Sequence, residues 1–163
     1  MRCQGGESKV RFLLIDRITE WEPGKRASAI KNVALSEDFF DDHFPLKPIM
    51  PAVLILEGMA QLSGLLIEEG VRKESGRIVK ALMSIIEKAK FRRPVYPGDK
   101  LVYSAAVESV NELGGRANVK AHVDGDLITE CAFVFTFHKI DNAHLELRRA
   151  EILSLWLKGV LTT

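Results

Sequence analysis

The sequence is poor in cysteine and carries almost no net charge. Its two cysteines, Cys3 and Cys131, lie too far apart for a disulfide framework or a metal-binding spacing. The 23 Lys and Arg residues nearly balance the 22 Asp and Glu residues, which leaves a formal net charge of +1. These absences argue against a disulfide-stabilised secreted scaffold and against a protein whose main task is to bind nucleic acid. We therefore expect a reduced, cytoplasmic setting.

Signals for export and for repeat architectures are also missing. The first seven residues contain no apolar segment of the kind that a secretory signal requires, and no internal repeat or low-complexity segment follows. Hydrophobic residues nevertheless make up 47% of the chain, which is enough for one domain with a sizeable core. We expect a main domain over residues 1–140 and a helical extension over residues 141–163.

The longest apolar segment covers residues 53–67 and follows a loop that contains three prolines. Pro51 suits the first turn of a helix, where its missing N–H is no loss. A helix that is apolar on all sides either spans a membrane or lies in a protein core. In a membrane Glu57 would lie near mid-span, where an acidic residue costs about 2.5–3.5 kcal/mol on insertion scales. We therefore predict a helix buried in protein.

The carboxylate on this helix needs a partner, and the preceding loop offers one. A buried Glu57 must be paired, hydrogen-bonded or protonated, and Gln61 lies one turn away on the same face. His43 stands in the proline loop, which can hold it at low entropic cost. Glu57 could make a structural hydrogen bond, or His43 and Glu57 could form an acid/base pair across a ligand tunnel. The spacing alone leaves both interpretations open.

The remaining segments predict an antiparallel sheet around the helix. We expect strands over residues 10–21, 26–35, 77–87, 100–110, 116–123 and 127–139, and a short helical turn near Ser36. The 77–87 strand is mainly apolar and should face the helix. We expect the central helix to end in an exposed segment at residues 68–70 and a polar loop at residues 71–76. One long apolar helix between strands joined by short turns favours an α+β fold, with the sheet wrapped round the helix.

The last segment, residues 143–161, has the spacing of an amphipathic helix. One face carries Leu153, Trp156, Leu157, Val160 and Leu161. We expect this face to pack on its own sheet or at a subunit contact. Attachment to a membrane surface or to a partner's groove is the alternative, and we do not favour it.

The other histidines do not form a metal site in the sequence. His122, His138 and His144 each lack a second ligand at a metal-binding spacing. Asp41 and Asp42 next to His43 offer the right ligand types, but adjacent residues rarely converge on one ion without distant partners. We expect no metal.

Several blocks of residues together resemble the (3R)-hydroxyacyl-[acyl-carrier-protein] dehydratases of bacterial fatty-acid synthesis. The blocks are FFDDHFP at residues 39–45, PIMPAVL at 48–54 and EGMAQ at 57–61, with FLLIDR at 12–17 and KFRRPVYPGD at 90–99. The resemblance covers about residues 10–139. Glutamate rather than aspartate at position 57 is similar to the branch that only dehydrates. The resemblance implies the hot-dog fold, here with an extra C-terminal helix.

The resemblance also implies a reaction and roles for individual residues. The enzyme would be a hydro-lyase that converts a 3-hydroxyacyl thioester on acyl carrier protein to the trans-2-enoyl thioester, without a cofactor beyond the carrier's phosphopantetheine. His43 would be the general base, a protonated Glu57 the general acid, and the Ala52 N–H would polarise the thioester carbonyl. The tunnel would be lined by Phe44, Pro51, Val53 and Gln61.

The resemblance further implies partners. It predicts a homodimer in which His43 of one subunit meets Glu57 of the other, and it leaves open whether three dimers associate. A basic cluster, Lys88, Lys90, Arg92 and Arg93, would steer an acidic carrier protein, although such a cluster is often only a solvated surface.

Four positions depart from the family pattern. The family commonly has glycine where this chain has Asp42, Leu46 and Ala52, and usually alanine at Gly58. Alanine retains the backbone N–H, so the role of Ala52 can survive. A hot-dog thioesterase, which would use the helix carboxylate to activate water, and a non-catalytic acyl-chain-binding homologue stay open. The sequence does not fix the acyl length or the pathway.

Overall fold

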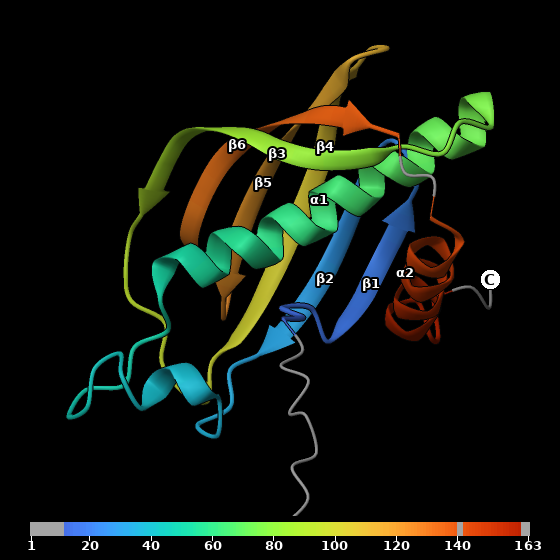
Figure 1. The fold of residues 1–163 in the computed structure, drawn as a ribbon. Coiled ribbons are helices and arrows are strands. Elements are labelled where there is room, and N and C mark those ends of the chain that lie inside the picture. The colour runs from blue at the N-terminus through green and yellow to red at the C-terminus, as the bar shows by residue number, and fades with distance from the viewer. Residues whose placement is uncertain (1–11, 140–141, 161–163) are drawn as a thin grey trace, which may run out of the picture.

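One long helix crosses the inner face of a curved sheet (Figure 1). The computed structural model describes residues 12–139 and 142–160. The elements are β1 (Arg17–Glu22), β2 (Arg26–Asn32), the 3-10 turn η1 (Asp38–Phe40), α1 (Ala52–Ser75), β3 (Lys80–Phe91), β4 (Lys100–Val110), β5 (Gly114–Val123), β6 (Asp126–His138) and α2 (Ala143–Trp156). The sheet has the order β1-β2-β4-β5-β6-β3, and every neighbouring pair is antiparallel. The predicted α+β architecture is confirmed, and it is that of the hot-dog fold.

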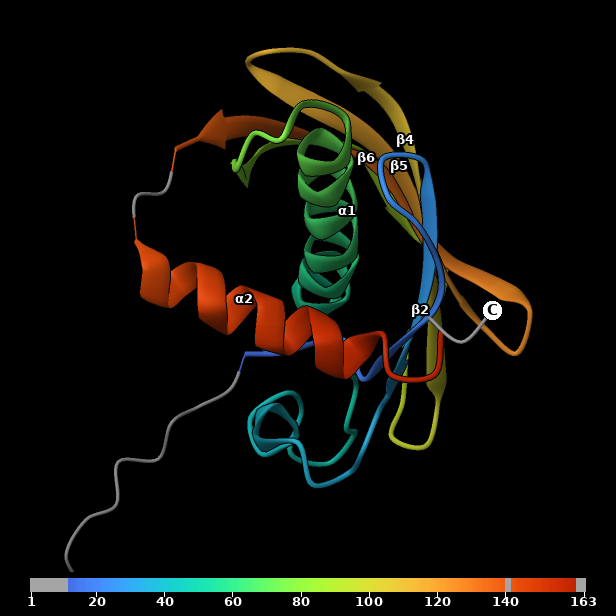
Figure 2. The same ribbon diagram turned by 90° about the vertical axis from the view of Figure 1, so that its right-hand side faces the viewer.

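The core lies between α1 and the concave face of the sheet. A view along α1 shows the strands curving round it on one side, while α2 lies across the other side (Figure 2). Alternate residues of β4 and β5 are buried, as expected for strands that cover a helix with one face. The core residues of these elements are Leu101, Tyr103, Ala105, Ala117, Val119 and Ala121 in the strands and Met59, Leu62, Leu66 and Ile67 in α1.

The predicted end of the central helix is wrong. Residues 68–70 were expected to be exposed and residues 71–76 to form a loop, but α1 continues to Ser75 and ends at Gly76 in the left-handed conformation. Glu68 is only 1% exposed, because its carboxylate has partners from other elements. Gly70 lies against Gly24, where a Cβ on Gly70 would come within 2.3 Å of the Gly24 Cα. Residues that looked like a helix end are therefore buried tertiary contacts.

Strand β3 was expected to face the helix with its apolar side chains, and this is only partly correct. Ala81 is buried, but Leu82, Met83, Ile85 and Ile86 are 40–52% exposed. Strand β3 is the edge of the sheet, paired with β6 alone among the strands of the described residues. An exposed apolar edge strand is an unusual surface for a single chain and is typical of one that another chain covers.

Three of the remaining strands, β4, β5 and β6, lie close to their predicted ranges. Strand β4 matches its prediction residue for residue, and β5 and β6 agree within two residues. Strand β1 begins only at Arg17 and β2 ends at Asn32, and residues 10 and 11 of the first predicted strand lie outside the described residues. Within the described ranges, no helix combines the length and apolar character needed to cross a membrane.

The C-terminal helix packs against its own chain and contacts β1 of its own sheet, the first of the two placements that we expected. The Asn142 side chain caps α2 by accepting hydrogen bonds from the backbone N–H groups of His144 and Leu145. Trp156 and Leu157 are buried in the core, with the helix ending at Trp156 rather than at residue 161. Leu161, the last residue of the predicted face, lies outside the described residues.

Candidate active site

The loop before α1 holds the His43 ring in one orientation. The backbone N–H of His43 donates to the Phe39 carbonyl at 3.1 Å, and its carbonyl accepts from the Ile49 N–H at 3.1 Å. The ring nitrogen Nδ1 lies 2.9 Å from the Ile49 carbonyl oxygen. Because a carbonyl can only accept, Nδ1 carries the hydrogen in this contact, and a neutral ring then has its lone pair on Nε2. Half-buried His43 can therefore act as a base through Nε2.

The Phe44 ring lies next to this imidazole. The two ring centroids are 4.3 Å apart and the rings are stacked, and the peptide bond that joins the residues is cis. Backbone hydrogen bonds between Phe44 and Lys47 in both directions close the loop that follows. This turn leaves Phe44 and Leu46 exposed in the single chain.

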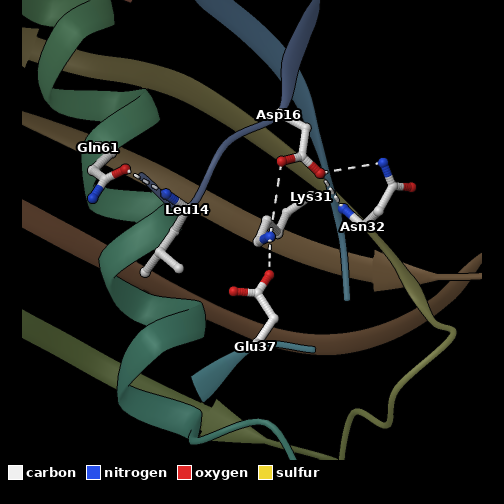
Figure 3. Close-up of polar contacts among 6 residues, drawn as sticks. All are labelled: Leu14, Asp16, Lys31, Asn32, Glu37 and Gln61. Carbon is white, nitrogen blue, oxygen red and sulfur yellow. Dashed lines mark hydrogen bonds and ion pairs between the residues drawn. The ribbon is translucent and has the colours of Figure 1, made fainter. Parts of the chain in front are cut away.

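Glu57 is held by the glutamine one helical turn away. The Gln61 Nε2 donates to Glu57 Oε1 at 3.0 Å and to the Phe12 carbonyl at 3.1 Å. The Gln61 Oε1 accepts from the Leu14 N–H at 3.1 Å, a contact visible in Figure 3. Gln61 thus uses both ends of its amide to tie the segment before β1 to α1, and it orients the Glu57 carboxyl group. Both side chains are partly buried.

A second polar network anchors the chain just before the His43 loop (Figure 3). The Lys31 side chain on β2 is buried and donates to Glu37 Oε1, and its Nζ lies 3.8 Å from Asp16 Oδ1. Asp16 Oδ2 in turn accepts from the Asn32 N–H at 2.6 Å. Because Glu37 immediately precedes η1, this network fixes the start of the segment that leads to the histidine.

Glu57 lines a cavity of about 440 Å³. Its walls come from α1, from β3 and β6, and from α2; the apolar side chains include Leu65, Leu82, Met83, Phe135, Ile152 and Trp156. Gln61 lines this cavity, as predicted for a tunnel residue, whereas His43, Phe44, Pro51 and Val53 are not among the described residues that line it. In the single chain, the two candidate catalytic groups do not share one cavity.

The start of α1 offers backbone donors. Ala52 is the first residue of the helix and Pro51 is its N-cap, one position before the predicted one. No side chain in the described ranges caps this end. The first N–H groups of a helix lack intrahelical acceptors and lie at the positive end of its dipole, so a carbonyl oxygen placed there would be polarised. Val53, in the next position, is exposed.

The basic cluster lies at and beyond the end of β3. Lys88 and Lys90 border a broad depression of about 770 Å³ that also contains Ser104 and Ala106 on the sheet face turned away from α1. Glu20, Glu87, Glu130, Arg116 and Lys120 line the same depression, so its charge is mixed. Arg92 pairs with Glu130 across the β3–β6 ladder. Lys88, Lys90 and Arg92 are exposed, whereas Arg93 is only half-exposed, so the cluster is neither fully exposed nor free of acidic neighbours.

Metal binding was not expected, and the described ranges contain no group of three His, Cys, Asp or Glu side chains able to hold an ion. Cys131 is buried and free, and burial raises the pKa of its thiol to about 12. Tyr103 is fully buried against Gly58, and this burial raises the pKa of its phenol. Both groups therefore stay protonated at neutral pH, and neither is activated as a nucleophile.

Comparison with known proteins places this arrangement in a family. A family model described as a FabA-like domain matches residues 7–132. The chain belongs to the FabA-like family. It is similar to the 3-hydroxyacyl-[acyl-carrier-protein] dehydratase FabZ of Geotalea uraniireducens, with 46% identity over 128 residues, or 77% of this chain and 86% of that protein. The FabZ of Thiobacillus denitrificans is 44% identical over 127 residues, again 77% of this chain and 86% of the relative.

Solved structures support the fold of this FabA-like chain. A Streptococcus mutans protein crystallised with acetyl-CoA matches with a TM-score of 0.61, covering 85% of this chain and all of that chain. Its sequence identity is only 11%, so the likeness shows the fold alone. The match of the family model ends before α2, which begins at Ala143.

Sequence reasoning missed three charged residues of this region: Lys31, Glu68 and Arg149. The burial of Lys31 could have been predicted, because Lys31 lies on the same face of β2 as Ala27 and Ala29, which is the face turned to the core. A lysine is rarely buried there without partners. Glu68 and Arg149 form an ion pair that joins α1 to α2. No local pattern identifies that pair, because the two residues come together only when α2 packs on α1.

Proposed function

We propose that this chain removes water from a (3R)-3-hydroxyacyl thioester carried on acyl carrier protein and releases the trans-2-enoyl thioester. The observation that carries the proposal is the 46% identity to a 3-hydroxyacyl-[acyl-carrier-protein] dehydratase over 86% of its length. The geometry of His43 and Glu57 supplies side chains suited to that chemistry. The thioesterase alternative is not favoured, because relatives above 40% identity are dehydratases.

In the proposed reaction, one proton passes from the substrate to His43 and one passes from Glu57 to the departing hydroxyl group. His43 Nε2 takes the proton from C2 of the substrate, and the electron pair of that C–H bond forms the C2=C3 double bond. The C3–O bond breaks as protonated Glu57 gives its proton to the departing hydroxyl, which leaves as water. The Ala52 N–H stabilises negative charge on the thioester oxygen during proton removal. Atoms and charge balance without a metal, a redox cofactor or a second substrate.

We place the complete site between two copies of the chain. Within one copy, His43 does not line the cavity beside Glu57. Leu82 and Met83 line that cavity, and the exposed apolar side chains of β3, which also include Ile85 and Ile86, support β3 as the dimer contact. In such a dimer, His43 of one subunit would enter the Glu57 cavity of the other.

We further propose that the carrier protein docks near the end of β3. Acyl carrier protein is expected to be acidic, and the exposed Lys90 and Arg92 would attract it over a distance. Charge reversal at Lys90 should raise KM for carrier-bound substrate without changing KM for a pantetheine-bound one. We place the reaction in the cytoplasm, as the free thiol at Cys131 and the absence of a disulfide framework suggest.

The experiment follows the conjugated enoyl thioester by ultraviolet absorbance in both the hydration and the dehydration direction. We expect His43→Ala and Glu57→Gln each to lower kcat/KM by about 10²- to 10⁴-fold, the usual contribution of one general acid or base. His138→Ala is the matched control, because His138 is exposed at the end of β6. Wild-type rates in both site variants would contradict the proposal, and release of free thiol would favour a thioesterase.

Mixing the two inactive variants tests the shared site. If one site takes His43 from one chain and Glu57 from the other, each mixed dimer keeps one intact site. Random exchange of subunits makes half of the dimers mixed, so mixing should restore up to about a quarter of wild-type activity. Sites built within one chain would stay inactive in every mixture.

A further inference from the structure

The cavity beside Glu57 has one wall that lies outside the matched FabA-like domain. Residues of α1, β3 and β6 form the wall nearest the carboxylate. Helix α2 contributes three apolar residues, Leu145, Ile152 and Trp156, and the charged residues Glu146, Arg148 and Arg149. Figure 2 shows α2 lying across the side of α1 that the sheet leaves uncovered. Without α2, the cavity would be open to solvent on this side.

Helix α2 is fixed in this position at its middle and at its end. Arg149 Nη2 lies 2.7 Å from Glu68 Oε2 and 3.1 Å from Glu69 Oε1. Trp156 and Leu157 are buried in the same core as α1 and the sheet. Because Glu68 is 1% exposed, an undocked α2 would leave a buried carboxylate without its closest cation. The helix is thus a defined wall of the cavity.

The chemistry of this wall suits an alkyl chain. In the proposed reaction, C3 of the substrate lies at Glu57, so the part of the acyl chain beyond C3 must leave the carboxylate in some direction. Besides Glu57, the cavity is lined by apolar side chains, among them Leu65, Met83, Ile152 and Trp156, and by charged side chains that include Lys80 and Arg149. Burying each methylene there would favour binding, while a chain too long for the space would meet α2.

We propose that α2 closes the far end of the acyl-binding cavity and that Ile152 and Leu145 set the length of the acyl chain that the enzyme accepts. This inference rests on the proposed dehydratase function for its substrate. It assigns a specificity role to a helix beyond residue 132, where the match to the FabA-like model ends.

Two substitutions should change the length preference in opposite directions. Ile152→Ala enlarges the cavity at a partly buried position, and Leu145→Trp fills it from an exposed position where a larger side chain does not strain the fold. Leu147 is exposed on α2 and does not line the cavity within the described part of the chain, so Leu147→Ala and Leu147→Trp are the matched controls.

The first measurement is kcat/KM for a series of enoyl thioesters that differ by two carbons. Burial of one methylene is worth about fourfold in binding. Ile152→Ala should therefore raise the ratio of long-chain to short-chain kcat/KM by about 4- to 16-fold, for one or two methylenes gained. Leu145→Trp should lower the same ratio, and both Leu147 variants should leave it unchanged.

The second measurement is calorimetric binding of saturated acyl-pantetheines of the same lengths, which cannot be dehydrated. A length preference that shifts with Ile152→Ala and Leu145→Trp supports the α2 wall, even if turnover is absent and the proposed dehydratase function fails. If the wild type turns over but both variants keep its length profile in both measurements, the α2 wall is overturned and the dehydratase function stands.

Discussion

Replacing Arg149 with methionine tests how α2 is held. The Arg149 side chain is 11% exposed, and its guanidinium group contacts Glu68 and Glu69, with Glu146 further away at 3.9 Å. Its Nη2 and Glu68 Oε2 form an ion pair by distance, without the geometry of a hydrogen bond. Methionine keeps a long apolar side chain against the surface of α1 and removes only the charge.

The size of the effect depends on what Glu68 retains. Removing one partner of a buried pair costs about 3–5 kcal/mol when the other charge is left alone. Here Glu68 Oε1 still accepts from the Ala81 N–H at 2.7 Å and stays 3.3 Å from Lys80 Nζ. Because those partners remain, we expect Arg149→Met to lower the free energy of unfolding by about 2–3 kcal/mol. For a chain of this length, that loss lowers Tm by about 4–12 °C.

The neighbouring arginine provides the control. Arg148 pairs with Glu151 at 3.1 Å, but its side chain is 49% exposed, and such surface pairs are worth about 0–1 kcal/mol. Thermal unfolding of Arg149→Met and Arg148→Met should be compared at one protein concentration, since the stability of the proposed dimer would depend on concentration. Equal Tm values for the two variants would refute the view that the buried pair holds α2. Adding Glu68→Gln to Arg149→Met should then cost less than the sum of the single changes.

Three further predictions concern the core and the site. Gly58→Ala should destabilise the fold by about 1–3 kcal/mol, because the new Cβ would lie 2.5 Å from the Tyr103 hydroxyl oxygen, and a Tyr103→Phe background should reduce that loss in urea unfolding. Gln61→Leu should lower kcat/KM by about 10- to 100-fold, because the carboxyl group of Glu57 loses its orienting donor; an unchanged rate would contradict the positioning role. The Cys131 thiol, with its pKa raised to about 12 by burial, should stay protonated and resist alkylation at pH 8 until the protein unfolds, measured in a variant without the other cysteine. Rapid alkylation of the folded protein would contradict that burial.

Local patterns predicted the strands well where one face is buried and the other is not. Strand β4 follows strict alternation, and its predicted range was correct at both ends. Alternation is informative there because a strand that covers a helix must place every second side chain inward. The pattern of β3 is less informative, since this strand is apolar on both faces. Its apolar side chains are partly exposed, and the sequence pattern does not distinguish a face that covers the helix from a face that another chain covers.

The end of α1 could not be predicted for a physical reason. Glu68 and Gly70 are residue types that are typical of an exposed helix end. Their burial depends on Arg149 from α2 and on Gly24 from the β1–β2 turn, and both contacts exist only in the assembled fold. The same holds for Gly58. Its departure from the alanine that is usual in the family is explained by the Tyr103 ring, which occupies the space of the missing methyl group.

One of these failures, the burial of Glu68, falls where α2 meets the domain, and the residues of α2 near this contact have two separate roles. Arg149 neutralises Glu68, a residue inside the matched domain, and so determines whether α2 stays docked. Ile152, less than one turn further on, faces the cavity and has no part in that pair. Stability should therefore respond mainly to Arg149, and acyl length preference to Ile152. Loss of the Arg149 charge should broaden the length preference only to the extent that it undocks α2, whereas Ile152→Ala should shift the preference while α2 remains in place.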